Sequence, residues 1–507
     1  MAVSQYKLGA LLSYTTMGFN ALAGLLYTPW MVSCIGATDY GLYTLALSVV
    51  NMFLLDFGLS QAVTRFLARY YAREDKRSVP MFLGVVYKLY FILAIVIAAV
   101  FAAIYLNADL LYANLSQGEL DTFKNLFAVA ALYSCFLMPC MPFEGILVAR
   151  ERFIALNICT LVYRVLLVAG IVVALLNGMG VFALVVVNAC MGVLYAAAKY
   201  IIIKKCTGDR ADILSWNGDI AREMLGFSVW QAITQSTEQV SSVIMPSILA
   251  ITSGSVAVAV FGLASMINGY VYEISNVLRK MLYSSIARML QESDARIKLQ
   301  NQSIQVGKLQ LALTGFFLVG FIAVGDRFVS CWMGPGYPTL SLCCILIIAA
   351  NVFRMPQCVG DNALTLEGYV KQKALLGIFQ MVLVVIFGTM LSWTFGLVGG
   401  CVAVFLAGFL RAIGLQYLIN RYLGIDARMF FAGTFVPWLL PAVISGAGGL
   451  AISHIVPLSG WSGFIVCGLG TFLLYALLSL VFSWKGNDRD RLLRQLGLMS
   501  KRPVGRE

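Results

Sequence analysis

The chain has 507 residues, of which 60% are hydrophobic and only 12% are charged, and its mean hydropathy is +0.85. Soluble domains carry about 25% charged residues, so this composition excludes a water-soluble protein, a disordered chain and a coiled coil. Twelve cysteines, most of them inside apolar runs, are too dilute for a secreted disulfide scaffold. A polytopic membrane protein remains. At about 20 apolar residues per span, the length accommodates roughly 12–15 helices.

Fourteen apolar segments follow one another along the chain, and each is long enough to cross a membrane as a helix. They cover residues 8–34, 40–68, 80–105, 122–149, 153–177, 180–203, 222–249, 254–284, 304–325, 338–366, 373–394, 396–420, 429–453 and 461–484. The sequence therefore predicts an all-α polytopic membrane protein with about fourteen transmembrane helices.

The basic residues gather on one side of this topology. With the N-terminus in the cytoplasm, the inside ends and loops hold 29 of the 36 basic residues, among them Lys199, Arg279 and Lys373, whereas the outside loops hold only Lys124 and Arg327. Cytoplasmic loops of membrane proteins collect lysine and arginine. The net charge of +12 therefore indicates cytoplasmic termini, and it gives no support to nucleic-acid binding.

The spacing of the segments indicates an internal repeat. The first and seventh segments start about 214 residues apart, and so do the second and eighth. Six helices per unit is an even number, so the repeat is parallel, an arrangement that transporters use with the substrate between the halves. Channels and enzymes can also arise by duplication, so a repeat without a transport function is the alternative. The predicted parts are a six-helix lobe over 1–205, a second over 206–425, two extra helices over 426–486 and a basic cytoplasmic tail over 487–507.

Ten ionisable residues lie inside the apolar segments, where a charge at the centre of a helix costs about 2.5–3.5 kcal/mol. The cations are Arg65, Lys88, Arg164, Arg354 and Arg411, and the acids are Asp56, Glu144, Glu238, Glu273 and Asp361.

Polar residues also form stripes on two of these helices. One consists of Gln231, Gln235 and Glu238; the other runs from Asn351 through Arg354 to Asp361, with a kink expected at Pro356. The pattern favours a hydrated central cavity. The alternative is purely structural, with buried ion pairs such as Arg354–Asp361 locking helices together.

Catalytic and metal-binding motifs are missing from the sequence. The single histidine, His454, is expected to be solvated at the outer end of a helix, and Cys343–Cys344 lack the spacing of a zinc site. No phosphate-binding loop of the ATPase type occurs. We expect no catalytic residues, no metal site and no enzyme activity.

Residues 35–66, IGATDYGLYTLALSVVNMFLLDFGLSQAVTRF, resemble the N-terminal signature of Wzx-type polysaccharide flippases, which belong to the multidrug/oligosaccharidyl-lipid/polysaccharide (MOP) exporter superfamily. PFEGILVARERF at 142–153, WMGPGY at 332–337 and LEGYVK at 366–371 are similar to further segments of that family. The resemblance covers the first twelve predicted helices. The last two depart from the commoner twelve-helix form but occur in fourteen-helix relatives, including the peptidoglycan lipid II flippases.

The resemblance implies two six-helix lobes that work by alternating access. It implies a polyprenyl-pyrophosphate-linked oligosaccharide as cargo, such as a repeat unit of O-antigen lipopolysaccharide, capsule or exopolysaccharide, moved across a bacterial cytoplasmic (inner) membrane. The partners it implies are membrane lipids, a polysaccharide polymerase and chain-length machinery. A drug or cation antiporter of the same superfamily is the alternative, and it would be expected to hold a carboxylate in the first helix, which has none. A membrane-embedded glycan polymerase or ligase is disfavoured by the short outer loops, and a non-catalytic assembly scaffold is a further alternative.

Family members have a cationic lumen, and the residues assigned to substrate binding are Arg65, Lys88, Arg164 and Arg354. Of these, only Arg65 lies in a matched motif; the other three rest on their depth in the membrane. Candidates for ion coupling or gating are Asp56, Glu144, Gln235, Glu238, Glu273 and Asp361. No cofactor is expected, and an H⁺ or Na⁺ gradient is a candidate energy source.

Overall fold

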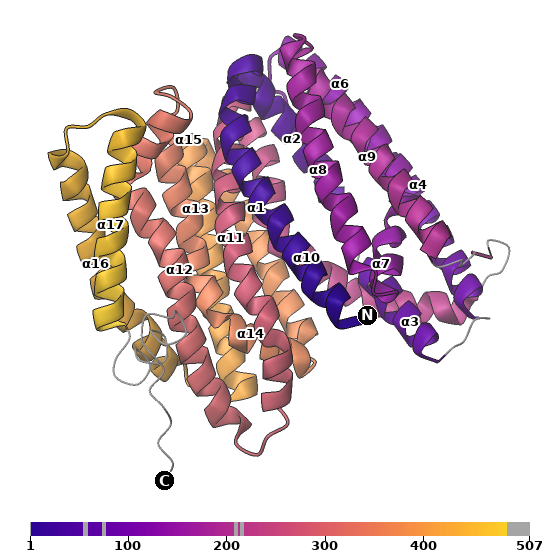
Figure 1. Cartoon of the computed structure of the whole chain (residues 1–507). Helices are drawn as coiled ribbons and strands as arrows, with labels where there is room; N and C mark the ends of the chain where they lie inside the picture. The colour runs from indigo at the N-terminus through magenta and orange to yellow at the C-terminus, as the bar shows by residue number, and fades with distance from the viewer. Residues whose placement is uncertain (1, 54–58, 74–77, 207–210, 213–216, 484–507) are drawn as a thin grey trace. The chain divides into compact units, whose positions relative to one another are not determined.

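A computed structural model of the whole chain describes residues 2–53, 59–73, 78–206, 211–212 and 217–483 (Figure 1). Every regular element within these ranges is a helix, which confirms the all-α prediction. Inside a bilayer each backbone polar group must bond within its own segment, and a helix satisfies this demand. The helices form two compact units: unit 1 comprises residues 1–262 and 377–400, and unit 2 comprises residues 263–376 and 401–507. The domain boundaries predicted from segment spacing stay a prediction.

Unit 1 holds the first ten α-helices. They are α1 (Ala2–Ile35), α2 (Ala37–Phe53), α3 (Leu59–Ala72), α4 (Ser78–Leu106), α5 (Ala108–Leu111), α6 (Gln117–Leu137), α7 (Pro142–Ala149), α8 (Phe153–Leu176), α9 (Gly180–Cys206) and α10 (Gly218–Ser253), with a 3-10 turn, η1 (Met138–Cys140), between α6 and α7.

The remaining helices belong to unit 2, except that parts of two helices lie in unit 1. They are α11 (Ser255–Met289), α12 (Ala295–Trp332), α13 (Leu340–Arg354), η2 (Met355–Gln357), α14 (Cys358–Leu366), α15 (Val370–Leu423), α16 (Ala427–Ile455) and α17 (Gly460–Phe482). The unit boundaries cross α11 and α15. α15 contains a non-helical break at Gly396, where φ is 58° and ψ is −139°.

Each of the fourteen apolar segments falls on helical structure wherever it is described. Within that part of the chain, ten helices are long and apolar enough to cross a membrane, or up to eleven if the pair of α1 and α2, bent by 115°, makes one span. The figure of ten counts α15 as one helix. The break at Gly396 divides α15 into the two segments that the sequence predicts.

Two of the expected spans are broken at matching places. The turn η1 interrupts the fourth span at Met138–Cys140, and η2 interrupts the tenth at Met355–Gln357, where a kink at Pro356 was expected. Each turn carries a proline, Pro139 or Pro356, and begins 217 residues from its counterpart. Proline has no N–H to continue the helical hydrogen bonds, so the same local sequence produces the same break.

The short helices that follow these turns also end in the same way. In α7 the N–H of Arg152 bonds to the carbonyl of Leu147 at 2.9 Å, and in α14 the N–H of Tyr369 bonds to the carbonyl of Leu364 at 2.9 Å. The residue before each donor has positive φ: Gly368 at 86°, and Glu151 at 56°. This is the left-handed cap that ends many helices, usually on glycine. The two segments are therefore local structural repeats.

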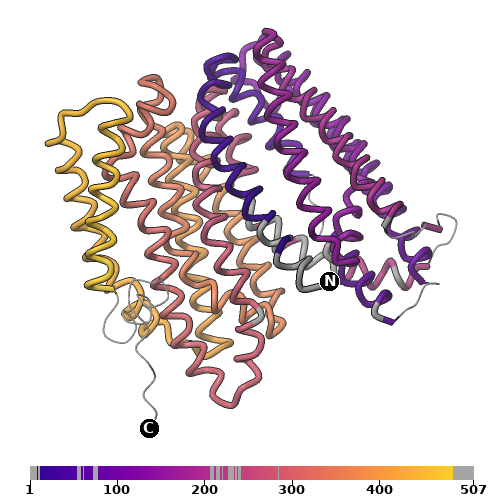
Figure 2. Tube along the Cα trace, viewed as in Figure 1, coloured from indigo at the N-terminus to yellow at the C-terminus, as the bar shows by residue number. Residues whose placement is uncertain are grey.

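The last two helices pack against α12 within unit 2 (Figures 1 and 2). Trp438 of α16 donates its indole N–H to the hydroxyl of Tyr475 in α17 at 2.8 Å, and that hydroxyl donates to the carbonyl of Leu311 in α12 at 3.1 Å. A Cβ on Gly315 would lie 2.4 Å from the Trp438 indole nitrogen, so glycine is needed where these helices meet. Small residues of this kind let membrane helices approach closely.

Candidate functional site

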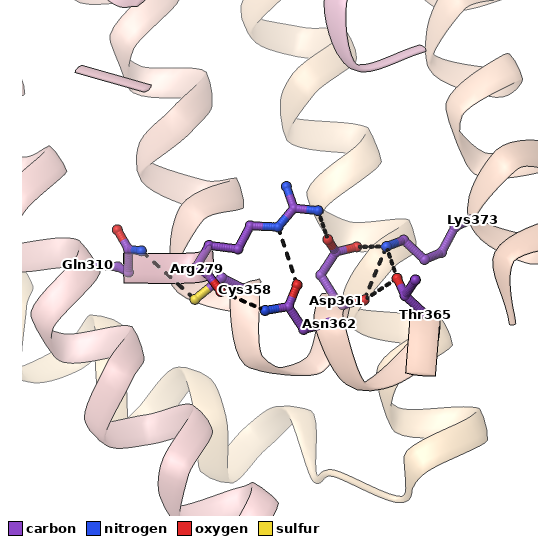
Figure 3. A network of polar contacts seen from close by, with 7 residues as sticks. All are labelled: Arg279, Gln310, Cys358, Asp361, Asn362, Thr365 and Lys373. Carbon is purple, nitrogen blue, oxygen red and sulfur yellow. Dashed lines mark hydrogen bonds and ion pairs between the residues drawn. The ribbon is translucent and has the colours of Figure 1, made fainter. Parts of the chain in front are cut away.

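A buried carboxylate with two cationic partners lies at the break of the tenth span (Figure 3). Asp361 stands in the first turn of α14, directly after η2. One of its oxygens is 2.8 Å from a guanidinium nitrogen of Arg279 in α11, and the other is 2.7 Å from Nζ of Lys373 in α15. The side chain of Lys373 is 5% exposed and that of Asp361 is 12% exposed. Three separate helices of unit 2 therefore meet at one carboxylate.

Neighbouring polar groups complete this network. Asn362 accepts a hydrogen bond from Nε of Arg279 at 3.4 Å and donates one to the Arg279 carbonyl at 3.0 Å. Lys373 donates to the hydroxyl of Thr365 at 2.7 Å and to the carbonyl of Asp361 at 3.1 Å. With two cations and one carboxylate the network carries a formal excess of one positive charge. A buried charge is tolerated when its hydrogen bonds are made, and here both cations have several acceptors.

A second polar line leads away from this network along α11. The buried Gln310 of α12 donates to the carbonyl of Ser275 at 2.9 Å and to the Cys358 sulfur at 3.8 Å. Further along α11, Asn268 accepts a hydrogen bond from Asn351 at 2.7 Å. Asn268, Ser275 and Arg279 are spaced by seven and four residues, so they lie on one face of the helix.

The matching place in unit 1 has a looser ion pair. Glu144 stands in the first turn of α7, 217 residues before Asp361, and its carboxylate is 3.5 Å from Nζ of Lys199 in α9. The Lys199 side chain is only 10% exposed, whereas that of Glu144 is 60% exposed. The Lys199 ammonium also lies 4.0 Å from the centre of the Tyr195 ring. The lysine is therefore buried with one solvent-facing counter-ion.

The four predicted substrate-binding cations are divided between the two units. Arg65 and Arg164 are exposed and Lys88 is half-buried in unit 1, while the half-buried Arg354 ends α13 in unit 2. The Arg164 guanidinium lies 5.7 Å from the centre of the Tyr163 ring. The role of these four cations in binding stays a prediction.

The predicted coupling residues have different surroundings. Asp361 and Glu144 take part in the ion pairs above, and Glu273 is exposed on α11. Asp56 and the side chains of Gln235 and Glu238 lie outside the described residues. Among the residues that are described, no three His, Cys, Asp or Glu side chains come together as metal ligands.

Three cations that the sequence placed at cytoplasmic ends and loops form ion pairs within the two units. Lys199 and Lys373 are buried, and Arg279 is mostly covered. The expected structural partner of Asp361 was Arg354, but its ion pairs are with Arg279 and Lys373. The reason is that a residue near the end of an apolar run can still point inward. On α9, the i, i+4, i+7, i+11 spacing of Asn188, Gly192, Tyr195 and Lys199 was the signal that would have found Lys199.

The two cations expected outside have local structural partners. Lys124 of α6 lies 2.7 Å from Asp109 of α5, and this hydrogen bond lowers the pKa of the exposed Asp109 carboxyl. Arg327 of α12 donates to the Ser453 hydroxyl at 2.9 Å and to the carbonyl of Leu458 at 2.7 Å, which ties α12 to the connection between α16 and α17. Both residues therefore tie neighbouring helices to each other.

Comparisons with known proteins agree with this architecture. The sequence profile of the family described as polysaccharide biosynthesis protein matches residues 8–291. No curated protein sequence matches significantly. The fold is similar to that of the lipid II flippase MurJ in an inward closed conformation, with a TM-score of 0.71 and 14% identity over 96% of this chain and 99% of that one.

Two further solved structures extend the likeness to other transporters. An inward-facing multidrug resistance MATE family transporter of the MOP superfamily has a TM-score of 0.60 and 16% identity over 80% of this chain and 98% of that one. A MOP superfamily transporter from Pyrococcus furiosus, described as having a binding pocket of reverse polarity, has a TM-score of 0.56 and 13% identity over 83% of this chain and 95% of that one. At these identities the likeness establishes the fold.

Proposed function

Because the chain belongs to the polysaccharide biosynthesis protein family, we propose that it is a flippase for a polyprenyl-pyrophosphate-linked oligosaccharide. The family match is the observation that carries the proposal, and the MOP-type fold supports it. The repeat unit of an O-antigen, capsule or exopolysaccharide is the cargo class. Transport then involves no covalent chemistry by this chain.

The physical obstacle to such transport is the charge of the pyrophosphate. Moving two negative charges through hydrocarbon is prohibitive, so cations within the membrane must replace the lost water. Arg65, Lys88, Arg164 and Arg354 are the proposed phosphate-binding residues, since arginine can bind phosphate oxygens with two parallel hydrogen bonds. The lipid tail stays in the bilayer while pyrophosphate and sugars cross by alternating access.

The energy source and the cellular setting belong to the same proposal. A membrane potential that is negative inside favours export of an anion by about 2.3 kcal/mol per charge per 100 mV. Asp56, Glu144, Gln235, Glu238, Glu273 and Asp361 are the proposed coupling or gating residues for H⁺ or Na⁺. The setting is a bacterial inner membrane with both termini cytoplasmic, where a polysaccharide polymerase and chain-length machinery would take over the product.

Reconstitution into liposomes tests the function directly. A fluorescent polyprenyl-pyrophosphate oligosaccharide is incorporated, and its exposure in the opposite leaflet is measured with and without protein. We expect protein-dependent movement of the intact lipid. Hydrolysis or extension of the glycan would instead indicate an enzyme, and absence of movement would refute the proposal.

A point variant tests the cationic pathway within the same assay. Arg354→Ala is expected to abolish movement, and Arg354→Lys to retain part of it, because lysine keeps the charge but loses the bidentate geometry. Arg288→Ala, which removes an exposed arginine in the last turn of α11, is the matched control and should leave movement unchanged. Full activity of Arg354→Ala would exclude this residue from the pathway.

A drug or cation antiporter is the second candidate, because solved MATE transporters share the fold. Such a protein would exchange a cationic drug for H⁺ or Na⁺ in the same liposomes and leave the lipid-linked glycan in place. Drug efflux without movement of the glycan lipid would favour this second function.

A further inference from the structure

A pocket of about 260 Å³ lies within unit 1, between α6, α8 and α9. Its lining includes three tyrosines and a lysine among small and apolar residues: Tyr133, Ser134, Leu137, Cys140, Met141, Tyr163, Gly192, Tyr195, Ala196 and Lys199. The rings of Tyr163 and Tyr195 stack with their centres 4.7 Å apart and their planes inclined by 23°. The pocket is smaller than the roughly 300–1,000 Å³ that encloses a drug-sized ligand, so it suits a single ring rather than an oligosaccharide.

Hydrogen bonds hold two of the rings in place. The hydroxyls of Tyr195 and Thr160 lie 2.9 Å apart, and the Tyr163 hydroxyl donates to the side-chain oxygen of Asn188 at 3.4 Å. Gly192 gives the third ring its place, because a Cβ there would lie 2.2 Å from the Tyr133 hydroxyl oxygen. Contacts with neighbouring residues therefore position all three rings.

Helical spacing separates this pocket from the apolar faces of the same two helices. Tyr195 and Lys199 share one face of α9, and the exposed Val193, Leu194 and Ile201 lie outside that face. On α8, likewise, Tyr163 shares a face with the buried Leu167, not with the exposed Val162. Apolar residues face lipid and polar residues face the interior or water in a membrane helix. On α9 the pocket residues thus lie away from the exposed apolar side chains.

Among the described residues that line the pocket, Lys199 is the one that carries a charge. Glu144 does not line the pocket; its carboxylate reaches Lys199 at 3.5 Å and is largely exposed to solvent. A charge-assisted hydrogen bond is normally about 2.7–2.9 Å long, so this pair leaves the ammonium able to take a better acceptor. A ligand carboxylate entering beside the stacked pair of Tyr163 and Tyr195 would provide one.

We propose that this pocket binds one pyranose ring carrying an acidic substituent, with the ring against the tyrosines and the carboxylate on Lys199. A pyranose has an apolar C–H face and a rim of hydroxyls, which match the apolar body and polar tip of tyrosine. The inference rests on the proposed glycan transport, and it assigns one sugar of the cargo to Tyr133, Tyr163, Tyr195 and Lys199. The neighbouring Glu144 then acts as the resident competitor of the ligand.

Binding of a soluble sugar tests the pocket without any transport. The purified full chain in detergent is titrated with methyl β-glucuronide and with the neutral methyl β-glucoside, and contacts are followed by saturation-transfer NMR. We expect the glucuronide to bind more tightly, since a charge-assisted hydrogen bond contributes enough for about a tenfold difference in Kd or more. Equal binding of both sugars, or binding of neither, would overturn the proposal.

Variants give effects of opposite sign. Lys199→Gln should weaken glucuronide binding about tenfold, and Gly192→Ala should weaken it by displacing the Tyr133 ring. Glu144→Gln should strengthen it, because the competing carboxylate is gone; a purely structural Glu144–Lys199 pair would give no gain. Gly18→Ala in α1, where nothing lies within 4 Å of the added Cβ, is the neutral control. Weaker binding in Glu144→Gln would contradict the competitor role.

The liposome assay on the same preparation separates this proposal from the proposed function. Movement of the glycan lipid without binding of the glucuronide would leave the flippase intact and refute the sugar pocket. Binding of the glucuronide without movement would support the pocket and refute the flippase.

Discussion

Two spans of this protein are interrupted by a proline-containing turn, and they differ in how the acid that follows the turn is held. Each break is a proline-containing 3-10 turn followed by a short helix with an acid in its first turn and a left-handed cap at its end. In unit 2 the acid, Asp361, is buried between Arg279 and Lys373. In unit 1 the acid, Glu144, is exposed and reaches Lys199 at 3.5 Å beside an open pocket.

The difference shows that a repeated backbone feature can serve stability in one half and ligand access in the other. Desolvated charges with several hydrogen bonds fix the helices that carry them, because breaking a buried ion pair leaves a charge without a partner in the protein interior. An exposed carboxylate stabilises little and can be exchanged for a ligand. The network of Asp361 is therefore suited to holding three helices together. The ion pair of Glu144 is suited to opening when a ligand binds Lys199.

The largest effect is expected for Asp361→Asn. The change leaves Arg279 and Lys373 close together without a counter-charge, and breaking a buried pair in this way costs about 3–5 kcal/mol. The measurement is the midpoint of thermal unfolding of the purified protein in detergent. An unchanged midpoint would show that the network does not lock the three helices.

Lys373→Met is expected to be next in size. Asp361 keeps its ion pair with Arg279, but the Thr365 hydroxyl, one Asp361 carboxylate oxygen and the Asp361 backbone carbonyl lose their donor, so a loss of about 1.5–3 kcal/mol is expected. The same unfolding measurement checks it. A loss larger than that of Asp361→Asn would mean that the lysine, rather than the carboxylate, organises the network.

The two helix caps should respond to reciprocal substitutions. Gly368→Ala places a side chain at φ 86° and should destabilise by about 1–2 kcal/mol, whereas Glu151→Gly removes one from φ 56° and should stabilise by up to about 1 kcal/mol. Both are read from thermal unfolding. Changes of the same sign in the two variants would show that the caps are not equivalent.

The smallest effect is expected for Glu144→Gln. The carboxylate is 60% exposed, so its ion pair with Lys199 should contribute less than about 1 kcal/mol to stability. Thermal unfolding should hardly change while glucuronide binding strengthens. A destabilisation as large as that of Asp361→Asn would erase the distinction between the two spans.

The sequence predicted the helical architecture well because its signal is local. Apolar runs of about 20 residues predict helices wherever they occur, and all fourteen segments fall on helix where the structure describes them. A kink was predicted at Pro356 for the same reason, since proline acts on its own turn of helix, and the 3-10 turn η2 lies there. The matching cap at Glu151 was missed because a glutamate gives no sign of positive φ.

The choice of ionic partners could not be predicted in this way. Lys199, Arg279 and Lys373 stand near the ends of apolar runs and were counted only as signals of topology, whereas the structure gives each of them an ion pair. Arg354, only seven residues before Asp361, was the nearer partner in sequence. Distance in sequence is a poor guide here, because Arg279 reaches Asp361 from another helix and across 82 positions.

The sequence by itself determined that this chain is a helical membrane protein with charges within its spans, because hydropathy and chain length act over one segment at a time. Only the tertiary structure decided which charges are buried in tight ion pairs and which have an exposed, more distant partner. Burial and pairing depend on the faces that separate helices present to one another, and that brought Lys373 to Asp361 and left Lys199 beside three tyrosines.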